Sequence, residues 1–260
     1  KLSLFSLPSF SMPSLMIFFV GFALYSSSTL LPMMVQSNFG YDATLAGMVL
    51  SPSGLVVICI MPIIGKLVNK VQAKYLISTG MFLMAFGMWA TAQITPQSDY
   101  WTLVQVRILQ VIGLPFLFVP SSTLAFSKIK AVDSSNASAI VALMRNLGGS
   151  IGIAIVTNKL IQSQQVEQNN IVQHLTNFDI GYNNALYNMT NTIKNLGFSE
   201  TQASQMALGK IYRELMHQAS LLAYADAYEF VATIMILLGI VALFMPKNEL
   251  HGKKKTVVIE

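Results

Sequence analysis

The chain has 260 residues, of which 53% are hydrophobic and only 10% are charged, and its mean hydropathy is +0.57. A soluble domain carries about a quarter charged residues, so this composition excludes an ordinary soluble domain and indicates a protein whose apolar surface faces lipid. The formal net charge is +5, but no basic stripe alternates with aromatic residues, so no nucleic-acid partner is expected. The single cysteine, Cys59, excludes an internal disulfide.

Six segments are apolar and long enough to cross a bilayer, whose hydrocarbon core takes about 20 helical residues. In chain order they are Leu15–Val35, Ala43–Gly65, Tyr75–Pro96, Trp101–Phe126, Ala137–Leu160 and Leu221–Met245. The predicted fold class is an all-α integral membrane protein, a bundle of six transmembrane helices with a long extracytoplasmic loop of amphipathic helices before the last span. Because the chain begins at Lys1 without an initiating methionine, we expect it to be part of a longer protein.

The expected organisation has five parts. They are residues 1–13 as a cytoplasmic entry segment, 14–160 as spans one to five, 161–220 as an extracytoplasmic loop or hairpin, 221–246 as the sixth span, and 247–260 as a basic cytoplasmic tail. Residues 1–13 contain two prolines and precede an apolar run too long for a signal peptide, so we expect no cleaved leader.

The connections between spans alternate in charge. Lysines gather between spans two and three, between spans four and five, and after span six: Lys66, Lys70, Lys74, Lys128, Lys130, Lys247 and Lys253–Lys255. The connections after spans one and three carry no lysine or arginine, only Asp42 and Asp99. Positive residues remain on the cytoplasmic side, so both termini are predicted to be cytoplasmic, which agrees with an even number of spans.

The segment before span six has a helical pattern of its own. Its apolar residues recur at helical spacing: Leu186, Met189, Ile193 and Leu196. Gly197 is expected to end this helix, and Ser199 with Gln202 matches a capping box that begins a second helix leading into span six. For Gln162–Asn184, rich in Asn and Gln, an ordered hairpin and a loosely ordered solvated loop remain alternatives.

Span five contains a permanent cation. Arg145 lies about eight residues into the span, roughly 12 Å deep at 1.5 Å per residue. An arginine at the centre of a membrane helix costs at least about 2.5 kcal/mol, so the side chain must face a cavity or find hydrogen-bond acceptors. Arg145, with Asn146 beside it, either contacts substrate or has a structural role by reaching the interface or helix-end carbonyls.

Small residues follow the arginine in span five. Gly148, Gly149 and Gly152 share this stretch, and the first and last of them lie four residues apart on one helix face. In lipid, small residues let two helix backbones approach closely, and the packing between them supplies the attraction. We therefore expect a contact or sliding surface against another helix.

Span four combines polar residues with prolines. Arg107, Gln110 and Gly113 lie at helical spacing, and Pro115 and Pro120 each leave a carbonyl without its donor. Span two has prolines as well, at Ser51–Gly54 and at Pro62, where the second could be only a packing kink. Paired interrupted helices predict a cavity between repeats.

Enzyme chemistry is not indicated. Asp226 and Glu229 lie near the outer end of span six and are interpreted as interfacial acids, and no carboxylate lies near the middle of a span. The histidines His174, His217 and His251 have no metal-ligand spacing, and no nucleophile–base pair or phosphate-binding loop is found. The prediction is therefore no enzyme, no metal and no cofactor.

Several motifs resemble those of one transporter superfamily. "GKLVNKVQAK", with Gly65, Lys66, Asn69 and Lys70, looks like the cytoplasmic signature turn of the major facilitator superfamily, and "RILQVIG" is similar to the arginine motif of its fourth helix. "GYDATLAGMVLSPSGL", "FVPSSTLA" and "ASAIVALMRNLGGSIGIAI" resemble the second half of fourteen-span drug:proton antiporters of the EmrB/QacA type. The resemblance covers nearly all of residues 1–250, and its most specific part is the run around Arg145.

This resemblance implies half of a major facilitator fold in a bacterial inner-membrane exporter of amphipathic, often cationic compounds, driven by proton entry. The implied partners are membrane lipid, a drug-like substrate, the proton, an N-terminal transporter half absent from this chain, and a periplasmic adaptor protein. The candidate substrate-path or conformational residues are Arg107, Gln110, Pro120, Arg145 and Asn146. Two departures stand out: Asn69 occupies a position that is usually acidic, and the family's first-helix coupling carboxylate has no counterpart here.

Two other functions remain open. One is a non-transporting membrane subunit or scaffold whose outer hairpin binds a partner, and the other is an inactive, truncated transporter. A scaffold does not require Arg107, Arg145 or interrupted helices, so the sequence favours the exporter.

Overall fold

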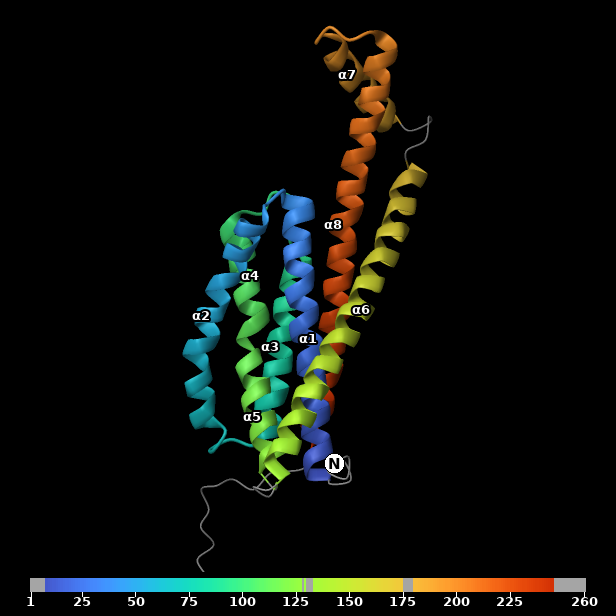
Figure 1. The fold of residues 1–260 in the computed structure, drawn as a ribbon. Coiled ribbons are helices and arrows are strands. Elements are labelled where there is room, and N and C mark those ends of the chain that lie inside the picture. The colour runs from blue at the N-terminus through green and yellow to red at the C-terminus, as the bar shows by residue number, and fades with distance from the viewer. Residues whose placement is uncertain (1–7, 128, 130–132, 175–179, 246–260) are drawn as a thin grey trace, which may run out of the picture. The chain divides into compact units, whose positions relative to one another are not determined.

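The computed structural model describes residues 8–127, 129, 133–174 and 180–245, and every regular element in these residues is a helix (Figure 1). The helices are α1 (Pro8–Phe39), α2 (Ala43–Leu67), α3 (Ala73–Ala92), α4 (Tyr100–Ile112), α5 (Leu114–Phe126), α6 (Ser134–His174), α7 (Ile180–Lys194) and α8 (Glu200–Leu243). Six helical stretches, with α4 and α5 counted as one, are long and apolar enough to cross a membrane. The predicted all-α class with six spans is confirmed.

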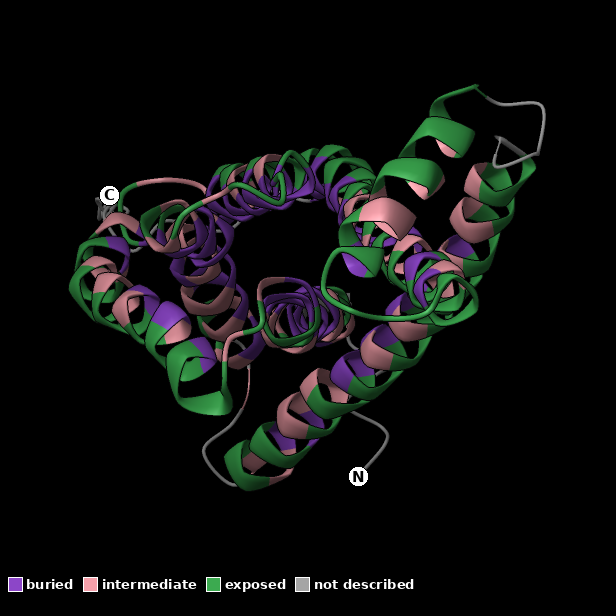
Figure 2. Cartoon of the chain, turned by 90° about the horizontal axis from the view of Figure 1, so that it is seen from above, coloured by how far each residue is buried: buried purple, intermediate pink, exposed green. Residues whose placement is uncertain are grey.

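Two compact units make up the chain. The first contains residues 1–157 and 228–260, and the second contains residues 158–227. In the first unit α3 packs against α4 and α5, α1 packs against α5, and α2 packs against α4 and α5. Buried residues lie mainly on the helix faces that meet one another in this unit, and exposed residues lie on the other faces (Figure 2).

Aspartates begin two of the membrane helices. The Asp42 carboxylate accepts a hydrogen bond from the Leu45 amide at 2.7 Å at the start of α2, and the Asp99 carboxylate accepts one from the Thr102 amide at 3.1 Å at the start of α4. These carboxylates satisfy amides that have no partner inside the helix. Hydrogen bonds from Thr102 hold the pKa of Asp99 below its usual range. The bond from the Thr102 hydroxyl has the largest effect, and the bond from its amide has the next largest.

The prolines do not interrupt span two, so this part of the sequence prediction is wrong. α2 is continuous through Pro52 and Pro62. Pro52 provides no amide for the Met48 carbonyl, and the Ser51 hydroxyl donates to that same oxygen at 3.2 Å. At Pro52 a local side chain thus supplies the missing donor.

Span four is interrupted next to Pro115, as predicted, but not at Pro120, through which α5 is continuous. α4 ends at Ile112 and α5 begins at Leu114, with Pro115 in the first turn of α5. Gly113 separates the two helices and itself keeps a right-handed conformation, with φ −76° and ψ −16°. The break is therefore local, and it lies two residues before the proline that removes a hydrogen bond.

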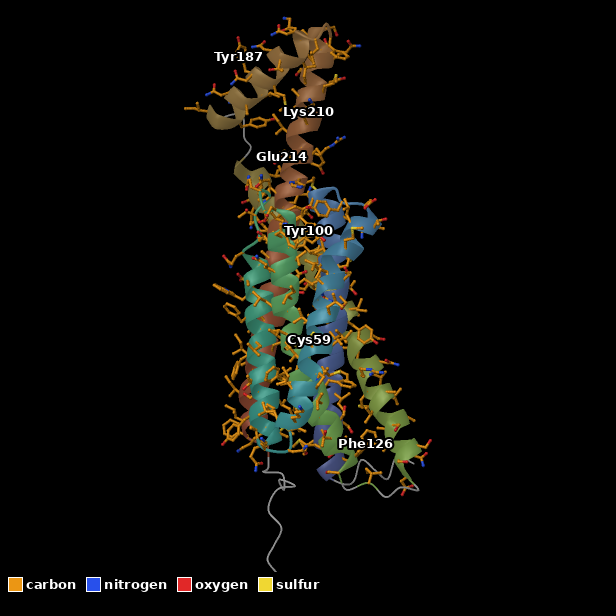
Figure 3. All side chains as sticks on the ribbon, turned by 90° about the vertical axis from the view of Figure 1, so that its left-hand side faces the viewer. Cys59, Tyr100, Phe126, Tyr187, Lys210 and Glu214 are labelled. Carbon is orange, nitrogen blue, oxygen red and sulfur yellow. The ribbon has the colours of Figure 1, made fainter. Side chains whose placement is uncertain are left out.

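The second unit contains the end of α6, all of α7 and the first part of α8. Ile193, Ala203 and Ala207 form its buried apolar cluster, against which Leu186 and Met189 pack. The expected capping box is present, because the Ser199 and Gln202 side chains bond to each other's amides. Tyr187, Lys210 and Glu214 are exposed on this unit (Figure 3).

Helix boundaries do not coincide with the expected membrane boundaries at residues 160 and 220. α6 continues to His174 and α8 begins at Glu200, because neither junction contains a proline or a capping signal that would end a helix. Gln162–Asn184 is helical up to His174 and again from Ile180, and the residues between lie outside the described part. Gly197 has φ +97°, a left-handed conformation that favours glycine, and it follows α7 closely, as expected.

Candidate functional site

A buried arginine connects α4 to α1 in the first unit. Arg107 is only 6% exposed. Its Nη1 donates to Ser27 Oγ at 3.2 Å, and its Nη2 donates to Ser28 Oγ at 3.1 Å. Ser27 in turn donates to the Leu24 carbonyl at 3.1 Å, so the serine hydroxyl is oriented to accept from the guanidinium.

The same arginine connects α4 to α3 through Gln110. Arg107 Nη1 donates to Gln110 Oε1 at 3.1 Å, a contact that the spacing of three residues on one helix face permits. Gln110 is fully buried, and its Nε2 donates to Thr91 Oγ1 at 2.7 Å. Thr91 donates onward to the Gly87 carbonyl at 2.7 Å. We call Ser27, Ser28, Thr91, Arg107 and Gln110 the arginine network.

The arginine network is cationic and contains no carboxylate. Arg107 Nε is buried and has no hydrogen-bond partner among the residues that the structure describes. A buried guanidinium without a counter-ion is energetically unfavourable, and hydroxyl and amide oxygens only partly replace the water it has lost. Chemically, the network can hold a permanent positive charge inside the membrane and offer it to an anionic group that approaches.

Close backbone contacts position the network. A Cβ atom added to Gly87 would lie 2.6 Å from the Gln110 Cα, and one added to Gly80 would lie 2.8 Å from the Gly113 carbonyl oxygen. Only glycine leaves room for α3 to approach α4 this closely. Gly80 and Gly87 are seven residues apart, hence on one face of α3, and this spacing in the sequence could have predicted the contact.

Glycines of α6 lie against α1 in the first unit. A Cβ atom added to Gly148 would collide with the Phe18 carbonyl oxygen, and one added to Gly152 would lie 2.8 Å from the Phe22 carbonyl oxygen. On α1, Gly21 meets the Arg145 carbonyl in the same way. A Cβ atom added to Gly149 would lie 2.8 Å from Cγ of the Tyr25 ring. We call this contact of Gly21, Gly148, Gly149 and Gly152 the α1–α6 glycine contact.

Arg145 and Asn146 lie beside the α1–α6 glycine contact but not in the arginine network. Arg145 is half-buried and Asn146 is exposed. Arg145 Nε is buried without a hydrogen-bond partner among the described residues. Its main chain, not its side chain, makes the close contact with α1, so the two candidate arginines occupy different environments.

The remaining candidates are dispersed. Pro120 is buried within α5. Gly65 is half-buried near the end of α2, and Lys66, Asn69 and Lys70 are exposed. In the turn that follows α2, the Lys70 amide donates to the Leu67 carbonyl at 2.9 Å. Asp226 is half-buried and Glu229 is exposed on α8. Among the described residues, no group of three or more His, Cys, Asp or Glu side chains could hold a metal ion.

The family model for the Major Facilitator Superfamily matches residues 2–154. The chain belongs to the major facilitator superfamily. Membership confirms the family resemblance seen in the sequence, and together with the six apolar helices it indicates a multi-pass membrane protein.

The curated relatives are resistance and export proteins. The colistin resistance protein EmrB of Acinetobacter baumannii is 27% identical over 95% of this chain and 48% of its own length. The multidrug export protein EmrB of Escherichia coli is 25% identical over 94% of this chain and 47% of its own length. The fatty acid resistance protein FarB of Neisseria gonorrhoeae is 23% identical over 90% of this chain and 44% of its own length. The chain spans about half the length of these relatives.

Proposed function

We propose that this chain is the C-terminal half of a proton-coupled efflux pump of the major facilitator superfamily, which exports amphipathic compounds, cationic ones among them, across the bacterial inner membrane. The observation that carries the proposal is the arginine network, which joins three helices around a buried charge. Polar groups this deep in a membrane bundle are costly and characteristic of transport pathways. The names of the relatives support an export role.

Proton coupling in this proposal depends on the other half of the transporter. In the described part of the sixth span, Asp226 and Glu229 lie near the end that we propose faces outward, and no carboxylate lies nearer the middle of a described span. An arginine guanidinium does not release its proton in proteins, so arginines are unsuited to carry the coupling proton. The coupling carboxylate is therefore proposed to lie in the N-terminal half, with the arginines responding to its charge.

The proposed partners have surfaces on this chain. α2 exposes large apolar residues such as Leu55, Ile58 and Ile63, each more than 60% exposed, and we propose that part of this face contacts the N-terminal half. The second unit is proposed to face the periplasm and to meet an adaptor protein. Membrane lipid would cover the remaining apolar surface.

The proposed orientation places both termini in the cytoplasm and the second unit outside. Cysteines introduced at Asn183 and Lys70, in a Cys59→Ala background that removes an exposed thiol, report on the two sides of the membrane. An impermeant thiol reagent added to right-side-out vesicles is expected to label position 183 and not position 70. The opposite pattern would contradict the topology.

Export is tested by reconstitution. The complete protein is placed in liposomes with an acidic lumen, and uptake of a fluorescent cationic dye is followed. We expect gradient-dependent uptake that a protonophore abolishes, and no such uptake by residues 1–260 alone, because alternating access in this superfamily needs two bundles. Uptake by residues 1–260 alone would refute the assignment as half of a pump. Correctly inserted complete protein that moves no dye and no other amphipathic compound would favour a scaffold.

A further inference from the structure

A groove on the first unit lies between α3 and α8, outside the arginine network. Its volume is about 410 Å³. The two helices run antiparallel beside it, because Ser78 Oγ donates to the Gly239 carbonyl at 2.7 Å and Lys74 Nζ donates to the Leu243 carbonyl at 3.4 Å. The groove opens farther along the pair, near the end of α3, where Trp89 lies opposite Glu229.

The α3 side of the groove is aromatic. Phe82, Phe86 and Trp89 follow the i, i+4, i+7 spacing that places side chains on one helix face. The Phe86 and Trp89 ring centroids are 6.0 Å apart, with the ring planes inclined by 31°. The two residues are 53% and 50% exposed, so the rest of the chain leaves much of their ring surface uncovered.

The α8 side of the groove contributes a carboxylate. Glu229 is exposed, lines the groove, and forms no ion pair with any residue in the described ranges. The hydroxyl of neighbouring Thr233 donates to the main-chain carbonyl of Glu229 at 2.9 Å, so it does not neutralise the side chain. A carboxylate on a membrane-spanning helix is costly without a partner of opposite charge.

Charge complementarity determines the kind of ligand. Aromatic faces attract cations through their quadrupole, and a neighbouring carboxylate adds Coulomb attraction. The other charged side chains in the described membrane helices of the first unit are basic: Lys66, Lys74, Arg107 and Arg145. A compound with a positive charge and an apolar body is therefore attracted to this groove.

We propose that the α3–α8 groove, formed by Phe82, Phe86, Trp89 and Glu229, binds lipophilic organic cations that carry aromatic rings. In the orientation proposed above, it lies toward the extracytoplasmic side. The physiological role of the groove, a peripheral substrate site of the pump, rests on the proposed function. Binding itself requires no transport.

Equilibrium dialysis of the complete protein in detergent tests the site, with radiolabelled tetraphenylphosphonium as the ligand and tetraphenylborate as its anionic counterpart of the same shape. We expect Glu229→Gln to lose one bound cation per chain in the micromolar range, and Trp89→Ala to weaken the same site about fivefold or more. Trp89→Phe, which keeps an aromatic ring, is expected to retain most of the binding. Trp101→Ala removes a comparably exposed tryptophan outside the groove and is expected to bind normally.

Two results would overturn the proposal. One is unchanged phosphonium stoichiometry in Glu229→Gln, and the other is tetraphenylborate competing for this site as well as unlabelled tetraphenylphosphonium does. Unchanged thermal unfolding of the Glu229→Gln variant is the control for folding. Dialysis measures binding without a proton gradient. A protein that does not export can therefore still show the bound cation, so the dialysis tests the groove independently of the proposed export.

Discussion

Leucine in place of Gly148 is expected to abolish export by the complete protein, with activity falling at least tenfold. Gly148 is buried, and even a Cβ atom there would collide with the carbonyl oxygen of Phe18. A backbone atom cannot move aside by changing a rotamer, so α1 and α6 must separate. Overpacking of this kind costs about 1–3 kcal/mol, and sometimes more. The measurement is dye export in the reconstituted system together with thermal unfolding.

Alanine at the same position already adds the colliding Cβ atom, so Gly148→Ala is expected to be impaired, though less than the leucine variant. Gly209→Leu is the matched control, because a Cβ atom at Gly209 has no neighbour within 4 Å. Normal export and normal unfolding in Gly148→Leu would show that α1 and α6 do not need this contact.

Methionine in place of Arg107 is expected to lower both stability and export. It removes the donor to Ser27, Ser28 and Gln110, and the fully buried Gln110 Oε1 loses its hydrogen bond with Arg107. Leaving one buried polar group unsatisfied costs about 1–3 kcal/mol, so the free energy of unfolding should fall by this amount. We expect export to fall at least tenfold. Lysine should restore part of it, since it returns the charge but not the planar fork of donors.

A double variant separates structure from function in the arginine network. Arg107→Met with Gln110→Met removes both partners, and Ser27 and Thr91 still donate to the Leu24 and Gly87 carbonyls. Replacing both members of a buried pair by apolar groups can be nearly neutral, so we expect most of the stability to return. Export should remain low, because the charge is absent. A stable double variant that exports like the native protein would show that Arg107 has only a structural role.

Arg107 and Arg145 illustrate what can and cannot be predicted from one sequence. Both are identifiable from the sequence because a permanent charge in an apolar helix is visible without any structure. Their environments were not predictable. Arg107 bonds to Ser27, 80 positions earlier in the chain, and serines are too common in membrane helices to single one out as its partner. Thr91 was missed for the same reason, and Gly21 because no regular spacing marks it.

The prolines also show that the sequence predicts a local feature but not its structural outcome. Pro52 and Pro115 each remove one backbone donor, and this loss follows from the sequence alone. The proline alone does not decide whether the helix then breaks. Ser51 donates to the Met48 carbonyl and α2 continues, whereas span four separates into two helices at Gly113, whose amide donates to the Val111 carbonyl.

The sequence by itself determined the six spans, the all-helical class, the superfamily and the intramembrane charges. These depend on composition, helical periodicity and local motifs, which each segment contains independently of the others. Only the tertiary structure decided which helices meet: α1 with α6 through glycines, α4 with α1 and α3 through Arg107 and Gln110, and α3 with α8 beside the aromatic groove. In lipid every span is apolar on most faces, so hydrophobicity does not select a partner. Close packing of small residues and a few buried hydrogen bonds make that selection, and they exist only once two distant segments are in contact.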